Sequence, residues 1–497
     1  MIARALTDDK RVTAMCAPTG IGKLVVIVAI ALISKKPTCI VTNSKGLQQQ
    51  AMDEFASVGL VSLLGRNNYT CGMREDWTCE DGYPAQCPYK GTPMCPSSQA
   101  EMRAAVSYLV ITNYSKWTSS KKYGQGMNHF TQVIFDEAHY SYEALSAAMQ
   151  VKLNQKEIER TLGVEFLTEV DDFKPWKTWA VEARAAADWE LIEARKKIVR
   201  NANPKLSEIR HFFHMRNLVR RLSVLATASA KNWIVEPFET DRGSGFIFDT
   251  VNPGQYGEAA LLLRVPKVIM VSATLRPKAM FMIGVGKDNF SFKEYDSPFD
   301  PARHPIYYVP TMRVDGRAKD LSMLWLRHDQ LAARRRDRKG IVHSISYERQ
   351  EQLFMASRFR GSMIVNRRGE SIMDKIDEFR MADPGAILVS PSVGTGFDFH
   401  DAQSRWQLVL KVPFEPPSKI QKARQAIDKE YVYYRAMQYL VQAFGRDVRS
   451  ATDWAEAIIC DDHFGEWFMP RYGHLAPKSF HATYKVVDRV PQPLNYE

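Results

Sequence analysis

The chain has 497 residues, a length that suits two large lobes with smaller insertions better than one compact core. Apolar residues make up 45% of the chain and charged residues 25%, which is the balance of an ordinary soluble globular protein. Lys and Arg (67) outnumber Asp and Glu (56), and the formal net charge of +11 suits a polyanionic partner without establishing one.

The N-terminal 50 residues alternate apolar runs with turns and helices, the pattern of βαβ units in a parallel sheet. Asp8 and Lys10 interrupt any secretory signal near the start of the chain. The longest apolar run, 24–33, is far shorter than the roughly 18 residues that span a bilayer, so it predicts a buried helix. We therefore expect a cytoplasmic α/β protein with no membrane partner.

A phosphate-binding loop is predicted between the strand at 12–16 and this helix. Its residues are Ala17, Pro18, Thr19, Gly20, Ile21, Gly22 and Lys23. Small residues let backbone N–H groups surround phosphate oxygens at the helix N-terminus, and Lys23 reaches the β- and γ-phosphates. The Ser or Thr that normally follows the lysine to hold Mg²⁺ is replaced by Leu24, which cannot coordinate a hard cation. Mg²⁺ binding must therefore use water and other groups, or be weak.

A polar insertion interrupts the strand pattern at residues 67–100, which contain many Gly, Pro and Cys residues and little to bury. Four cysteines lie in it at an even spacing of eight: Cys71, Cys79, Cys87 and Cys95. Disulfides are rare in cytoplasmic proteins, so we expect a bound metal to hold the insertion together. Zinc sites usually contain close C-x₂₋₄-C pairs, which are absent, so the wide spacing favours an iron–sulfur cluster while zinc stays open.

Strand patterns return at 108–112 and 133–135, and the second of these leads directly into Asp136-Glu137-Ala138-His139. A carboxylate at the carboxyl end of a strand can hold Mg²⁺ through water, and its neighbour can polarise the attacking water. The position of this tetrapeptide, about a hundred residues after the phosphate loop, favours a catalytic role for Asp136 and Glu137.

The rest of the chain contains a helical block and a second set of strands. Residues 143–229 are charged, Ala-rich and helical in pattern, which predicts a separate insertion. Further strands are predicted at 268–271, 340–343, 386–389 and 408–412.

The phosphate loop, the four cysteines and the DEAH tetrapeptide, in this order, resemble the XPD/DinG-like family of iron–sulfur superfamily 2 helicases. Similar segments follow one another along nearly the whole chain. Thr42-Asn43-Ser44 resembles motif Ia, and Cys87-Pro88-Tyr89 resembles the cluster signature. The segment 110–114 resembles the return from the cluster domain, and Ser272-Ala273-Thr274-Leu275 resembles motif III. Ser297-Pro298-Phe299 resembles the start of the second lobe. After it, 343–347 resembles motif IV, and 394–399 resembles motif V. The segment 412–417 resembles the PFxPP turn, and 442–449 resembles motif VI.

This resemblance implies an α/β fold of two RecA-like parallel-sheet lobes, with a four-cysteine domain and a helical arch inserted in the first lobe. Lobe 1 is expected at 1–66, 104–140 and 229–285, the cluster domain at 67–103, the arch at 141–228 and lobe 2 at 286–497. The compact arch suggests a bacterial or phage source, and hence a host cytoplasm in the second case.

The resemblance also implies an ATP-dependent helicase that moves 5′ to 3′ on single-stranded or forked DNA as a monomer. ATP, Mg²⁺ and a [4Fe–4S] cluster on the four cysteines are the implied cofactors, with Asp136 holding Mg²⁺ through water. The implied catalytic groups are Lys23, Asp136 and Glu137 of the first lobe with Arg446 and Arg449 of the second, whose guanidinium groups would reach the γ-phosphate. The resemblance further assigns nucleotide sensing to Gly396, Asp398 and Gln442, coupling to Ser272 and Thr274, and DNA contacts to Thr42, Lys45, Asn113 and Tyr114.

Two departures from the family leave other interpretations open. Leu24 supports a pseudo-helicase that binds single-stranded DNA or a protein without productive hydrolysis. The adenine-reading glutamine of the family would precede Met1, so either the start is misplaced, the chain is truncated, or adenine is read loosely. A zinc-stapled nuclease or scaffold is a third interpretation, but it would leave motifs V and VI without a purpose.

Overall fold

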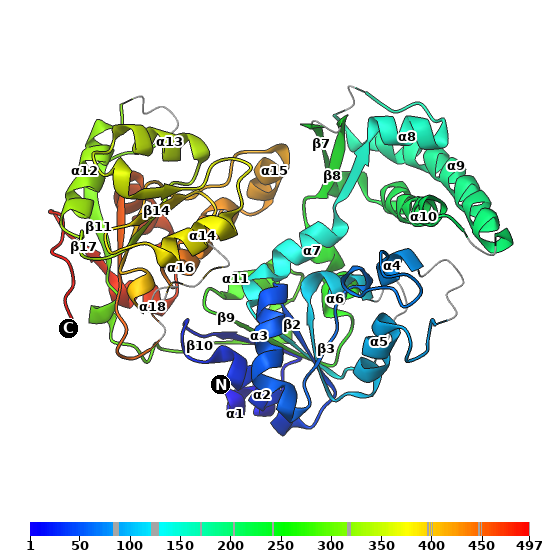
Figure 1. The fold of residues 1–497 in the computed structure, drawn as a ribbon, viewed down its shortest axis with the longest axis horizontal. Helices are drawn as coiled ribbons and strands as arrows, with labels where there is room; N and C mark the ends of the chain where they lie inside the picture. Colours follow the sequence, from blue (N-terminus) through cyan, green and yellow to red (C-terminus); the bar gives the residue numbers. More distant parts are fainter. Residues whose placement is uncertain are drawn as a thin grey trace.

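The structure, a computed structural model, consists of two α/β lobes and an arch that rises from the first lobe (Figure 1). It describes residues 1–82, 89–120, 129–168, 171–201, 204–240, 243–315, 320–394, 397, 399, 401–445, 448 and 450–496. None of the helices within these ranges is long and apolar enough to cross a membrane.

Lobe 1 is built on a seven-stranded parallel sheet in the order β10-β1-β9-β5-β2-β4-β3. Its strands are β1 (Val12–Cys16), β2 (Thr38–Thr42), β3 (Val61–Ser62), β4 (Leu109–Asn113), β5 (Gln132–Phe135), β9 (Lys267–Ser272) and β10 (Phe290–Glu294). Its helices are α1 (Ile2–Thr7), α2 (Lys23–Ser34), α3 (Lys45–Phe55), α5 (Pro96–Val106), α6 (Tyr114–Ser120), α7 (Ser141–Met149) and α11 (Pro277–Met282). Every residue of the central strands β1 and β2 is buried, as expected where helices cover both faces of a parallel sheet.

The arch contains three helices and a three-stranded antiparallel sheet in the order β6-β8-β7. Its elements are β6 (Val151–Asn154), α8 (Gln155–Leu162), α9 (Phe173–Arg200), α10 (Leu206–Thr227), β7 (Trp233–Thr240) and β8 (Gly243–Thr250). The expected arch at 141–228 covers the helices, but β7 and β8 pair with β6 and extend the unit to residue 250, while α7 packs on lobe 1. Antiparallel pairing between distant segments is invisible to a local helical pattern.

Lobe 2 is a second seven-stranded parallel sheet in the order β13-β14-β12-β15-β16-β11-β17. Its strands are β11 (Ile306–Met312), β12 (Gly340–His343), β13 (Met363–Val365), β14 (Ile387–Ser390), β15 (Trp406–Val409), β16 (Glu456–Asp461) and β17 (Tyr484–Val486). Its helices are α12 (Ser322–Ala333), α13 (Tyr347–Ala356), α14 (Ile372–Met381), α15 (Lys419–Ile427), α16 (Tyr431–Phe444), α17 (Met469–Tyr472) and α18 (Lys478–Thr483). The lobe boundary differs from the expected residue 286, because β10 pairs with β1 and so belongs to lobe 1.

The cysteine-containing insertion lies between lobe 1 and the arch, where its short helix α4 (Cys79–Gly82) faces α10. Cys71 and Trp77 of the insertion form one buried apolar cluster with Ile209 and Phe213 of α10. This cluster ties the insertion to the arch.

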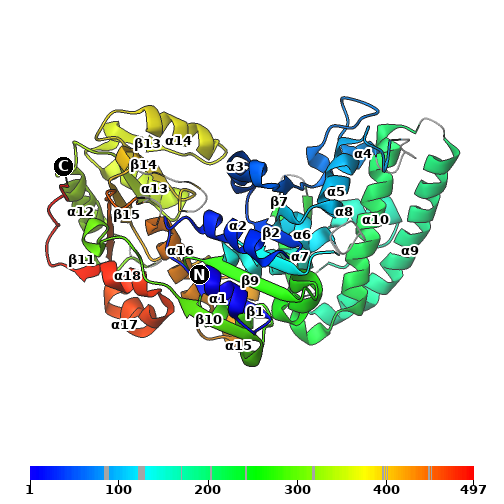
Figure 2. The same cartoon turned by 90° about the horizontal axis from the view of Figure 1, so that it is seen from below.

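The two lobes lie beside each other (Figure 2), and buried side chains of both belong to one apolar cluster. The rings of Tyr142 in α7 and Tyr431 in α16 lie 5.8 Å apart, edge to face. The Arg424 guanidinium of α15 donates to Ser146 Oγ at 2.7 Å and to the carbonyl oxygen of Thr250 at 3.0 Å. Helix α15 therefore joins lobe 2 to α7 and to the base of the arch.

Candidate functional site

The loop between β1 and α2 has the geometry of a phosphate-binding loop. Gly20 and Gly22 have φ angles of +78° and +71°, in the left-handed region that glycine tolerates. Their turns carry the chain from the carboxyl end of β1 over the first residue of α2, which is Lys23. The Lys23 ammonium donates to the carbonyl oxygen of Pro18 at 3.3 Å. The lysine thus lies across a loop whose backbone N–H groups and helix N-terminus can hold an anion.

Leu24 is an apolar residue in the first turn of α2. Its half-buried side chain packs against the apolar cluster that also contains Ile27 and Met15. The residue therefore serves the core under α2.

We expect Leu24→Thr to raise the rate of ATP hydrolysis about tenfold, which corresponds to about 1.4 kcal/mol of activation free energy. The hydroxyl would supply the oxygen ligand that the loop lacks. Steady-state hydrolysis measured across a Mg²⁺ titration checks this. Leu24→Val is the matched control, because valine has the shape of threonine without the hydroxyl. Equal rates in the two variants would show that the missing ligand does not limit hydrolysis.

The acidic pair lies at the carboxyl end of β5. Asp136 is buried, and one of its carboxylate oxygens accepts a hydrogen bond from the Glu137 backbone N–H at 2.9 Å. Burial raises the pKa of Asp136 to about 7; the charge of Glu137 adds to this effect and that of Lys23 opposes it. Glu137 has a φ of +46°, rare for a residue other than glycine, which turns its side chain away from the strand direction.

The carboxylate of Glu137 is in contact with motif III. Its Oε2 lies 3.4 Å from Ser272 Oγ and 3.4 Å from His139 Nδ1. His139 Nδ1 and Ser272 Oγ are themselves 2.7 Å apart. The proposed general base, the DEAH histidine and the serine at the end of β9 therefore form one polar cluster.

Lobe 2 reaches this cluster through α16. The Gln442 side-chain amide donates to Thr274 Oγ1 at 3.3 Å and lies 3.4 Å from His139 Nδ1. The hydroxyl of Tyr434, two turns earlier in the helix, donates to the carbonyl oxygen of Thr274 at 3.4 Å. The expected sensing and coupling residues Gln442, Ser272 and Thr274 are thus in a continuous network with Glu137.

The end of motif VI lies against the phosphate loop. A Cβ atom added to Gly445 would be 2.9 Å from the Thr19 side chain, and one added to Gly20 would be 3.2 Å from the carbonyl oxygen of Val448. Arg446 and Arg449 lie outside the described residues, as do Gly396 and Asp398 of motif V. The described neighbours Gly445 and Val448 bring the motif VI segment to the loop.

The comparisons with known proteins agree with this arrangement. A family model for the helicase C-terminal domain matches residues 332–483, and one for the res subunit of type III restriction enzymes matches 2–164. A search of curated protein sequences gives no match.

Among solved structures, three similar folds each cover 98% of this chain at 14% identity. They are described as "XPD_Helicase" (TM-score 0.65, 97% of that chain covered), "XPD_APO" (0.61, 99%) and "Structure of S. tokodaii Xpd4" (0.59, 98%). The second lobe therefore matches the helicase C-terminal family model in sequence, and the whole chain resembles the XPD structures in fold.

Three of the four cysteines predicted to hold a metal lie among the described residues. Sγ atoms of Cys79 and Cys95 lie 3.5 Å apart, and Cys71 is buried in the same insertion. Burial raises the pKa of Cys79 to about 12, whereas at Cys95 burial is outweighed by hydrogen bonds with Ser98 and Cys79 that lower the pKa.

Cys87 lies outside the described residues. No group of three or more His, Cys, Asp or Glu side chains that could hold a metal ion occurs within the ranges that the structure describes. The donor chemistry suits iron–sulfur or zinc.

The four residues expected to contact DNA separate into two pairs. Thr42 and Tyr114 are buried; the Tyr114 ring stacks on Phe135 at 5.6 Å and its hydroxyl lies 3.2 Å from Ser141 Oγ. Their side chains are therefore packed in the interior of lobe 1, and their role in DNA binding stays a prediction. Lys45 and Asn113, by contrast, line an open hollow.

This hollow lies where lobe 1, the cysteine insertion and the arch meet. Besides Lys45 and Asn113, its lining includes Asn43, Arg66, Asn68, Lys116, Phe213 and Arg216. Sequence reasoning missed Arg66, Phe213 and Arg216, because they come from separate units and share no spacing pattern with motif Ia. The hollow combines cations with one aromatic ring.

Proposed function

We propose that this protein is an ATP-driven helicase that moves 5′ to 3′ along single-stranded DNA and carries a [4Fe–4S] cluster in its insertion. The observation that carries the proposal is the contact of lobe 2 with both halves of the nucleotide site. Gln442 touches His139 and Thr274, and Gly445 packs on Thr19 of the phosphate loop. A nucleotide between the lobes would change these contacts, and such a change is what a motor requires.

In the proposed mechanism the loop and Lys23 hold the phosphates, and Glu137 accepts a proton from the attacking water. Asp136 would hold Mg²⁺ through water, and the bound ion would neutralise charge on the phosphates. Arg446 and Arg449 would face the γ-phosphate from lobe 2, as the position of their neighbours favours. Glu137 exchanges its contacts with Ser272 and His139 for the attacking water as lobe 2 moves.

DNA would bind in the hollow between lobe 1, the insertion and the arch. Its cations suit a phosphate backbone, and an aromatic ring such as that of Phe213 suits stacking with any base. Glu101 lies 3.6 Å from both Arg66 and Lys116 and offsets part of their charge. A single-stranded or forked DNA is the partner that fits these features.

The cluster would be held by Cys71, Cys79, Cys87 and Cys95. When bound, it would supply the folding energy that a polar segment of this length lacks. The contact between the Cys79 and Cys95 thiols supports a shared metal-binding role for these two residues. The short α4 and the ring of Trp77 would then be fixed against α10 of the arch.

The second candidate function is a pseudo-helicase that binds single-stranded DNA or a protein. The observation that favours it is Leu24, whose side chain packs into the core in place of a Mg²⁺ ligand.

DNA-stimulated phosphate release at saturating Mg·ATP separates the two functions. We expect single-stranded DNA to stimulate hydrolysis in the wild type and to have no effect in Lys23→Ala, which also guards against contaminating ATPases. DNA binding without stimulated hydrolysis in pure protein would favour the pseudo-helicase.

We expect Gln442→Ala to uncouple hydrolysis from unwinding. The truncated side chain no longer links α16 to Thr274 and His139, so DNA unwound per ATP should fall about tenfold, the scale of a coupling free energy of 1–2 kcal/mol. Parallel hydrolysis and strand-displacement assays measure the ratio. Gln425→Ala is the control, because the Gln425 amide donates to Lys429 within lobe 2. An unchanged ratio in Gln442→Ala would argue against this route of coupling.

A further inference from the structure

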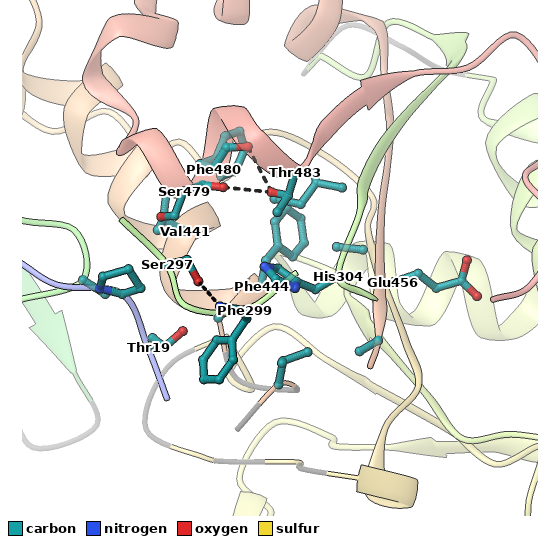
Figure 3. Close-up of a pocket in the computed structure, with 17 residues that line it drawn as sticks. Thr19, Ser297, Phe299, His304, Val441, Phe444, Glu456, Ser479, Phe480 and Thr483 are labelled. Carbon is teal, nitrogen blue, oxygen red and sulfur yellow. Dashed lines mark hydrogen bonds between the residues drawn. The ribbon is translucent and has the colours of Figure 1, made fainter. Parts of the chain in front are cut away.

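A cavity of about 700 Å³, counted to its open mouth, lies between the phosphate loop and lobe 2 (Figure 3). Pro18 and Thr19 of the loop form one side. The rings of Phe299, Phe444 and Phe480 line it from the segment between the lobes, the end of α16 and α18. The wall of the cavity beyond the phosphate loop therefore contains three aromatic rings.

Phe299 is held at the loop by a local turn. Its backbone N–H donates to Ser297 Oγ at 3.2 Å, and a Cβ atom added to Gly20 would lie 2.6 Å from Cε2 of its ring. One edge of the ring thus contacts the loop while the residue also lines the cavity. The Phe299 ring therefore forms an apolar wall of the cavity directly beside the phosphate loop.

His304 supplies a polar group on the same cavity. Its Nδ1 atom is buried and has no hydrogen-bond partner. Burial lowers the pKa of the imidazole, against the opposing charge and backbone hydrogen bond of Asp300, and so favours the neutral ring. Glu456 also lines the cavity, but both of its oxygens accept from Arg335, at 2.8 Å each. Of these two polar side chains, His304 is the one with a free position for a ligand.

We infer that this cavity takes the planar purine base of the nucleotide whose phosphates the loop holds. Phe299 stacks on the base, and the Nδ1 atom of His304 hydrogen-bonds to its edge. Aromatic walls with one oriented polar group are suited to a heteroaromatic ring and unsuited to a charged phosphate. The inference rests on the proposed ATP binding and names the residues that read the base.

Binding of ATP and of inorganic tripolyphosphate, measured by calorimetry with Mg²⁺ present, tests the inference. Tripolyphosphate occupies the loop but has no base. We expect Phe299→Ala to weaken ATP binding about tenfold and His304→Ala about fivefold. Both variants should bind tripolyphosphate as the wild type does.

Two further variants keep the test decisive. Phe299→Leu preserves apolar bulk without a stacking face, so it should also lose ATP affinity even if the alanine variant unfolds. Phe281→Ala is the matched control, because Phe281 is half exposed on α11, outside the cavity lining.

Unchanged ATP affinity in both Phe299→Leu and His304→Ala would overturn the inference, as would an equal loss for ATP and tripolyphosphate. A wild-type protein that binds neither ligand would instead overturn the proposed ATP site itself, and with it the base pocket.

Discussion

Replacing Glu137 with Gln is expected to lower ATP hydrolysis by about 10²–10⁴-fold while ATP still binds. The amide keeps the size of the carboxylate but cannot accept a proton from water. Its amide oxygen can still accept a hydrogen bond from Ser272 Oγ, and the amide can still contact His139, so the polar cluster beside β9 should persist. The loss would therefore report the chemical step and not the packing of the site.

Single-turnover hydrolysis with saturating single-stranded DNA measures the chemical step directly, and calorimetry with ATP shows that binding is retained. Glu258→Gln is a suitable control, because Glu258 is an exposed glutamate of lobe 1 paired with Arg11 at 2.7 Å. Wild-type turnover in Glu137→Gln would assign the general base to another group. Loss of both ATP binding and hydrolysis would mean that Glu137 is needed to bind the nucleotide and does not act only on the attacking water.

Local patterns predicted the parts of the site that are contiguous in sequence. The strands at 12–16 and 340–343 are confirmed as β1 and β12, and the apolar run 24–33 lies within α2. These predictions succeed because a buried parallel strand is a short apolar run that ends in turn residues. Parallel strands also align their carboxyl ends, so the phosphate loop and the DEAH residues had to share one edge of the sheet.

Features that depend on contacts between distant segments were not predictable in the same way. The strand β10 begins fifteen residues after Leu275, the last residue of motif III, yet it pairs with β1 and so moves the lobe boundary. Tyr114 begins a helix directly after β4, but tertiary packing buries it against Phe135. The contact of Phe299 with Gly20 joins segments that no periodicity connects.

The hollow lined by Lys45 and Asn113 depends on contacts between even more distant segments. Motif Ia located Lys45, but the other cations come from the residue before the insertion (Arg66), from α6 (Lys116) and from α10 of the arch (Arg216). Their assembly depends on the docking of the insertion onto α10, where Asp81 pairs with Arg210 at 3.1 Å. If that docking is lost, the hollow loses one of its walls.

We therefore expect Cys79→Ser to abolish DNA unwinding, down to the level of Lys23→Ala, while ATP binding at the phosphate loop is unchanged. The Cys79 thiol lies 3.5 Å from that of Cys95 and starts the helix that carries Asp81. A serine hydroxyl is a poor ligand for iron or zinc, so the insertion would lose the metal that supplies its folding energy. The unfolded segment could not hold Phe213 and Arg216 of the arch beside Lys45.

Iron content and absorbance near 400 nm, read beside unwinding and ATP binding, separate the causes of any loss. Cys39→Ala is the matched control: it removes a buried thiol from β2, outside the insertion, and should keep both the metal and unwinding. Zinc in place of iron would show that the proposed identity of the metal is wrong, but the metal would keep its structural role. Normal unwinding in Cys79→Ser without bound metal would show that the insertion holds its shape unaided, and the DNA path would then have to be sought away from α10.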